Sequence, residues 1–174
     1  IFGGGPPPAE CPPAAHIVFQ DEYGSDVTYE AYAGSKLDAV EVSADSAYAG
    51  TQGLEITIPG ADPWWSGGAF TDSTDRDLSG FNALTLWVKA SQAATIDAFG
   101  LGDDNTGTSK YKAEVVGGLA VTTDWQQYVI PVPLPEKLTA EGGLCFFAEG
   151  FEGADPYLIW MDEILYDSVT TITN

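Results

Sequence analysis

Positive charge is scarce in this sequence. Its 174 residues include six Lys and Arg against 26 Asp and Glu, which gives a formal net charge of −20. Nucleic acids and anionic membrane surfaces bind proteins through cationic side chains that neutralise phosphate, so both classes of partner are excluded. No apolar run reaches the roughly 18 residues that a membrane-spanning helix needs. The composition therefore predicts an acidic, soluble protein with a single core.

Histidine and cysteine are scarce too. The one His, His16, leaves no Ser-His-Asp, Cys-His or HExxH arrangement, which excludes the hydrolase sites built on them. The two cysteines, Cys11 and Cys145, lack the CxxC spacing of a zinc or redox site. A disulfide between them and two free thiols both remain open, and an extracellular location favours the disulfide.

Residues 1–15, IFGGGPPPAECPPAA, contain three Gly and five Pro, which prevent a helix or a central strand. We interpret them as an extended linker or arm, which either tethers two modules or is held by a neighbouring molecule. Because residue 1 is Ile and no signal sequence is present, we expect the chain to be a processed or excised piece of a longer one. Residues 16–174 then form one domain.

Long helical patterns are also absent, and LPEKLTAEG is the only stretch that predicts a helical turn. Short alternating segments follow one another about every 8 to 15 residues, separated by Gly, Asp, Thr and Pro turns. This pattern predicts an all-β fold, a two-sheet antiparallel β-sandwich of the jelly-roll type. The clearest core positions are Leu54, Ile56 and Ile58 on one strand and Leu84, Leu86 and Val88 on another, with Thr85, Trp87 and Lys89 on the opposite face of the second strand.

Two adjacent indoles, Trp64 and Trp65, precede the strand GGAFT and the polar connection DSTDRDLSG. Neighbouring side chains leave an extended segment on opposite faces, so at least one indole should be exposed or lie at a rim. An exposed Trp indicates a binding surface, whereas two half-buried ones would cap the end of a sandwich. The sequence leaves both interpretations open.

Five segments occur in an order that resembles a known family: VFQDEY, AYAGTQGLEITIP, RDLSGFNALTLWVKAS, TDWQQYVIPVP and YLIWMDEILYD. Together they resemble the calcium-containing jelly-roll carbohydrate-binding modules of secreted polysaccharide-degrading enzymes, especially those of bacterial β-glucan-degrading glycosidases and of surface glycan-binding proteins. The resemblance covers residues 16–168.

The resemblance implies a structural Ca²⁺ at one edge of the sandwich, joining the first and last strands. Carboxylates mixed with backbone carbonyls supply the six to eight oxygens that calcium prefers. In the alternative interpretation, Asp21 and Glu22 form a solvated turn and Asp162 makes a salt bridge or a turn hydrogen bond. The implied ligands lie in the segment of Gln20, Asp21 and Glu22, in the turn from Asp45 to Gly50, and at Asp162.

The resemblance also implies a glycan site on a concave sheet face or at edge loops. Sugars need aromatic plates flanked by hydrogen-bonding side chains. Cys145 should share a face with Phe147, so a bond to Cys11 would draw the arm across this site. The implied carbohydrate-binding residues are Trp64, Trp65, Asp97, Phe99, Asp103, Lys112, Glu114, Phe147 and Glu149.

These features predict a secreted or extracellular module that binds a polysaccharide, expected to be a neutral β-glucan, without catalysis, and that targets an attached enzyme or a cell surface to it. The alternative is a structural subunit of an extracellular assembly held together by the arm. Glycosidase activity would need a carboxylate pair, and Glu114 with Glu149 is a pair that chance alone would provide among so many acidic residues.

Overall fold

The computed structural model describes residues 16–102, 110–150 and 155–170, and the arm lies outside these ranges. The described residues form fourteen strands and two short 3-10 helices, with every strand pairing antiparallel. This confirms the predicted all-β sandwich. The strands are β1 (Ile17–Gln20), β2 (Glu22–Tyr23), β3 (Val27–Ala31), β4 (Val40–Ser43), β5 (Gly53–Ile58), β6 (Trp65–Arg76), β7 (Ala83–Ala90), β8 (Ala94–Ile96), β9 (Ala98–Gly102), β10 (Lys112–Glu114), β11 (Leu119–Val121), β12 (Gln126–Pro131), β13 (Glu141–Gly150) and β14 (Tyr157–Asp167).

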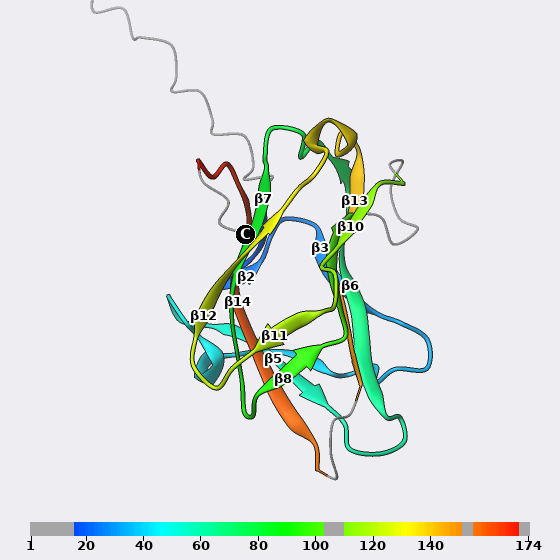
Figure 1. The fold of residues 1–174 in the computed structure, drawn as a ribbon, viewed down its shortest axis with the longest axis vertical. Helices are drawn as coiled ribbons and strands as arrows, with labels where there is room; N and C mark the ends of the chain where they lie inside the picture. The colour runs from blue at the N-terminus through cyan, green and yellow to red at the C-terminus, as the bar shows by residue number, and fades with distance from the viewer. Residues whose placement is uncertain (1–15, 103–109, 151–154, 171–174) are drawn as a thin grey trace, which may run out of the picture.

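Two large sheets face each other, with β7, β12 and β14 in one layer and β3, β6, β10 and β13 in the other (Figure 1). The seven-stranded sheet follows the order β12-β7-β14-β1-β2, and β5 pairs with both β14 and β4. The five-stranded sheet follows the order β10-β9-β13-β6-β3, and β8 pairs with β11 in a small third sheet. The last strand, β14, therefore lies between β7 on one side and β5 and β1 on the other.

The core lies between the two large sheets and consists of the alternate side chains of each strand. The six positions predicted on β5 and β7 are all fully buried, and Phe70, Phe99 and Phe147 face them from the five-stranded sheet. Burying each such side chain contributes roughly 1.5 to 3 kcal/mol, so this layer dominates the stability of the fold. Trp87 and Lys89 leave β7 on the opposite side, as the alternation predicts.

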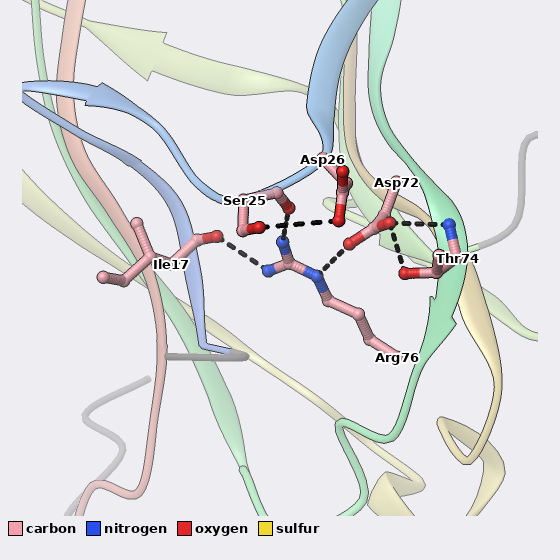
Figure 2. A network of polar contacts seen from close by, with 6 residues as sticks. All are labelled: Ile17, Ser25, Asp26, Asp72, Thr74 and Arg76. Atoms are coloured by element: carbon pink, nitrogen blue, oxygen red, sulfur yellow. Dashed lines mark hydrogen bonds and ion pairs between the residues drawn. The ribbon is translucent and has the colours of Figure 1, made fainter. Parts of the chain in front are cut away.

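Three local features differ from the expected pattern. The predicted first strand is divided into β1 and β2 at Asp21, whose φ of 58° breaks the extended conformation. The polar stretch after GGAFT is not a connection, because β6 continues to Arg76, where an ion pair with Asp72 stabilises the strand end (Figure 2). The predicted helical turn is the 3-10 helix at Pro135–Lys137, and a second one occurs at Ala44–Ser46. In the described ranges no helix has the length and apolar character to cross a membrane.

Candidate functional site

The outer face of the five-stranded sheet has a floor of small residues. One row of paired residues crosses all five strands, and the neighbouring row contains Gly67, Ala148 and Ala98. Because Gly has no side chain and Ala has only a methyl group, larger side chains at the margins can lie flat across the sheet. The crossing row runs from Glu30 through Ala69, Phe146 and Gly100 to Glu114.

Both adjacent indoles lie on glycines of this face. A Cβ atom built on Gly67 would be 2.8 Å from Cζ3 of Trp65, and one built on Gly150 would be 2.9 Å from Cζ3 of Trp64. The ring centroids of Trp64 and Trp65 are 6.3 Å apart. Trp64 is 61% exposed and Trp65 is half-buried, which confirms that at least one indole is open to solvent.

A third ring, Phe146, lies in the middle of the same face but is buried, with 7% of its surface exposed. A Cβ atom on Gly100 would be 2.5 Å from Cζ of Phe146, so this ring also rests on a glycine. The Nζ atom of Lys112 lies 5.6 Å from the centroid of the Phe146 ring, a cation–π distance. Sequence reasoning missed Phe146, because two adjacent Phe residues on β13 left open which one points outward.

Hydrogen-bonding side chains surround the three rings. Asp97 is exposed, and its Oδ2 accepts a hydrogen bond of 3.3 Å from the N–H of Gly150, directly below Trp64. Lys112 and Glu114 are exposed on the edge strand β10. The structure thus brings together five of the predicted residues, Trp64, Trp65, Asp97, Lys112 and Glu114, on one face; Asp103 lies outside the described residues.

Three predicted site residues do not lie on this face. Phe99 and Phe147 form a register pair that points into the core, and both are fully buried. Glu149 is buried as well; its carboxylate accepts hydrogen bonds from the Tyr157 hydroxyl and from the N–H of Asp97, each at 2.7 Å. The prediction that these three side chains face outward is therefore wrong, because alternation along β9 and β13 places them on the inner side of the sheet.

The carboxylates at the two ends of this row do not form a catalytic pair. Glu30 and Glu114 lie at opposite ends of the crossing row, four strand spacings or about 19 Å apart. Glycosidases need their two carboxyl groups within roughly 5 to 10 Å. Glu149 cannot complete a pair with Glu114, since Glu149 is buried on the inner side of the sheet. This geometry suits binding rather than hydrolysis.

Cys145 also lies in the core, where it is a free and fully buried thiol. Burial raises the pKa of this thiol well above its usual range. Cys11 lies outside the described residues, and a disulfide would require it to enter the core beside Phe70, the register partner of Cys145. Of the two alternatives that the sequence leaves open, the structure thus favours a free thiol at Cys145 over a disulfide with Cys11.

Two of the predicted calcium ligands, Asp21 and Asp162, bind the loop between the first 3-10 helix and β5. Asp21 Oδ1 accepts hydrogen bonds from the N–H groups of Thr51 at 2.6 Å and Gln52 at 3.0 Å. These bonds lower the pKa of Asp21. A Cβ atom on Gly50 would lie 2.2 Å from the same carboxylate oxygen, so only glycine fits there.

Asp162 holds the other end of that loop. Its buried carboxylate accepts hydrogen bonds from the N–H groups of Tyr48 at 2.8 Å, Ala49 at 3.1 Å and Glu163 at 2.7 Å. Direct hydrogen bonds thus join the first and last strands through the loop, as the ion was expected to do.

The other predicted ligands have different surroundings. Gln20 Nε2 donates to Glu163 at 2.7 Å, Glu22 is exposed, and the N–H of exposed Asp45 donates to Ser43. Within the described ranges, no group of three or more His, Cys, Asp and Glu residues could hold a metal ion. A calcium ion here would draw most of its ligands from backbone carbonyls around Asp21 and Asp162. Calcium binding stays a prediction.

Comparisons with known proteins give the family. A crystal structure of a family 30 carbohydrate-binding module has a TM-score of 0.61 and 18% identity, covering 90% of this chain and 89% of that one. The family 30 module of a cellulosomal cellulase of Clostridium thermocellum has a TM-score of 0.60 and 18% identity, covering 88% and 97%. The family 11 module of the same organism, in complex with a β-1,3-1,4-mixed-linked tetrasaccharide, has a TM-score of 0.54 and 15% identity, covering 88% and 96%.

The search of curated proteins found no match. The sequence profile described as Carbohydrate binding domain 30 matches residues 15–167, which is most of the 174-residue chain. The chain therefore belongs to the family of carbohydrate-binding domain 30, and it is a non-catalytic module that binds polysaccharide.

Proposed function

We propose that this module binds a neutral β-glucan across the outer face of its five-stranded sheet. The observation that carries the proposal is the pair of solvent-accessible rings, Trp64 and Trp65, each of which lies against a glycine, with the buried ring of Phe146 beside them. Flat rings match the apolar C–H faces of pyranose sugars, and they are held in place before the ligand arrives. Exposed Asp97, Lys112 and other polar side chains of the rim supply hydrogen bonds to hydroxyl groups.

Charge favours a neutral polysaccharide. With a net charge of −20, the module repels sulfated and uronic glycans, although Lys112 places one positive charge on this face. The similar family 11 module was solved in complex with a β-1,3-1,4-mixed-linked tetrasaccharide, which supports this choice of ligand class. We also propose that the module is secreted and targets an attached enzyme to this substrate, as the cellulosomal cellulase relative suggests.

Affinity electrophoresis and calorimetry test the proposal with soluble β-1,3-1,4-glucan, and with alginate as the charged comparison. We expect retardation by the β-glucan only. The variant Trp65→Ala should weaken binding about tenfold or more, since truncating a central aromatic contact costs on the order of 1.4 kcal/mol or more. The matched control is Val42→Ala, which shortens an exposed apolar side chain on β4 of the other sheet. Equal affinity of the two variants would contradict the proposal.

A further inference from the structure

The outer face of the seven-stranded sheet carries a second aromatic array. Trp87 and Lys89 lie on β7, Trp160 lies on β14, Trp125 directly precedes β12, and Tyr48 comes from the loop before β5. The register places Trp160 opposite Lys89. Gln126 pairs with Val88, so Trp125 lies opposite Lys89 on the other side. Lys89 thus has one indole on each side, Trp125 and Trp160.

The members of this array hold one another in place. The rings of Tyr48 and Trp87 are stacked with centroids 3.9 Å apart and an interplanar angle of 13°, and Trp125 meets Tyr48 edge-on at 5.6 Å. The Nζ atom of Lys89 lies 5.1 Å from the Trp125 ring and 4.9 Å from the Trp160 ring. These contacts fix the orientation of the side chains before any ligand binds, which reduces the entropic cost of binding.

The array is partly open to solvent. Tyr48 is 40% exposed, and the three indoles are neither buried nor fully exposed. Three of the five Trp residues of the chain are thus placed on the sheet face opposite to the proposed glucan site. Aromatic rings left at a surface in one contiguous patch indicate a binding surface.

Polar groups adjoin the rings as a sugar ligand requires. Trp160 Nε1 donates to Glu55 Oε2 at 3.2 Å, and Gln127 is the register partner of Trp87 on the edge strand β12. Across Trp125, Lys89 and Trp160 the array spans two strand spacings, about 10 Å, which is the scale of a short oligosaccharide. Hydrogen-bond donors and acceptors thus lie along an aromatic strip.

The chemistry of the array selects among ligand classes. A cationic ligand is disfavoured because Lys89 already lies between the two indoles that would hold it. An anionic polymer is disfavoured by the net charge of −20. We propose that this face is a second glycan-binding surface that takes a neutral polysaccharide chain, so that one module holds two chains on opposite faces. It does not depend on the proposed glucan site of the other sheet.

Indole N–H signals in NMR spectra provide the test, because five Trp residues report on two faces. Titrating the Trp65→Ala variant with soluble β-1,3-1,4-glucan should shift the signals of Trp125 and Trp160. In the Trp65→Ala background, the second substitution Lys89→Ala should reduce the remaining affinity for this polysaccharide by a further factor of at least five. The control for the loss of one positive charge is Lys36→Ala in the same background. Loss of binding in Trp65→Ala with no shift of these signals would overturn the second surface and leave the first site intact.

Two further outcomes keep the inference separable from the first site. Glucan binding that shifts Trp125 and Trp160 in the unsubstituted module, but is unaffected by Trp65→Ala, would support this surface and contradict the first one. Sedimentation that shows a module dimer dissolved by Lys89→Ala would overturn the proposal, because the array would then be a contact between two copies. Since Lys89→Ala removes a surface side chain without opening the core, we expect the variant to fold.

Discussion

Arg76 lies four residues after Asp72 on β6, and their buried side chains form an ion pair between Nε and Oδ2. The other guanidinium nitrogens donate to two backbone carbonyls, to Ile17 at 2.8 Å and to Ser25 at 2.7 Å (Figure 2). Asp72 Oδ1 accepts from the N–H and the hydroxyl of Thr74 at 2.7 and 2.8 Å. Arg76, held by its ion pair with Asp72, therefore connects the five-stranded sheet to β1 of the other sheet.

Replacing Arg76 by Ala should destabilise the module strongly. The change leaves the buried Asp72 carboxylate without its counter-charge and two backbone carbonyls without their donor, which costs about 3 to 5 kcal/mol for a buried pair. Urea unfolding followed by tryptophan fluorescence measures the loss. The control Lys36→Ala breaks the exposed pair with Asp38 and should change the unfolding midpoint little. Equal effects of the two substitutions would contradict the role assigned to Arg76.

The Asp72 carboxylate should also make the stability of the module depend on pH. Burial raises the pKa of Asp72, but hydrogen bonds from Thr74 and Arg76 outweigh it, and the pKa in the folded state is lowered. A lowered pKa means that the stabilisation is complete above the unfolded value near 3.9 and is lost as pH falls through the folded value. We expect the free energy of unfolding to fall below about pH 4. In Asp72→Asn the fall between pH 5 and pH 2 should be smaller; an unchanged slope would contradict the assignment.

The fold could be predicted because its signals are local. Alternation on β5 and β7 identifies the core face directly, and the Gly, Asp and Pro turns exclude long helices. The continuation of β6 through its polar end could not be predicted, because it depends on Arg76 reaching carbonyls on segments 51 and 59 residues away. Long-range hydrogen bonds of this kind leave no periodic pattern in the sequence.

The site was predicted in part for a similar reason. Trp64 and Trp65 are recognisable as an adjacent pair, and Lys112 and Glu114 follow from alternation on β10. The assignment of Phe147 to the outer face was wrong because Phe146 and Phe147 are equally apolar, and only the register with Gly100 places Phe146 outside. The second array was missed because its residues belong to separate strands and meet only across the sheet.

Calcium binding can be tested on stability alone. If an ion binds beside Asp162, calcium at about 100 times its dissociation constant adds roughly 2.7 kcal/mol to the free energy of unfolding. Thermal unfolding in 1 mM Ca²⁺ should then occur several degrees higher than in excess EDTA. In Asp162→Asn this difference should disappear. Identical melting curves of the native chain in calcium and in EDTA would show that the hydrogen bonds to Tyr48 and Ala49 hold the loop without an ion.

Cys145 should resist alkylation in the folded module. The thiol is fully buried, and its raised pKa keeps it protonated at pH 8, so iodoacetamide finds neither access nor thiolate. Mass spectrometry of peptides labelled with and without urea measures the protection. We expect labelling of Cys145 only after unfolding. A peptide joining Cys11 and Cys145 in the non-reduced sample would contradict the free thiol.

Gly150→Ala separates the position of Trp64 from the stability of the sheet. The new Cβ would lie 2.9 Å from the Trp64 ring and 3.4 Å from Asp97 Oδ2, and both of these neighbours are side chains. The indole should therefore be displaced while β13 keeps its pairing, so the melting temperature changes little and the affinity for β-1,3-1,4-glucan falls severalfold. Gly67→Ala is the informative comparison, because its Cβ also meets the Phe147 carbonyl at 2.9 Å and should destabilise the fold. Unchanged glucan affinity in Gly150→Ala would mean that Trp64 does not contact the polysaccharide.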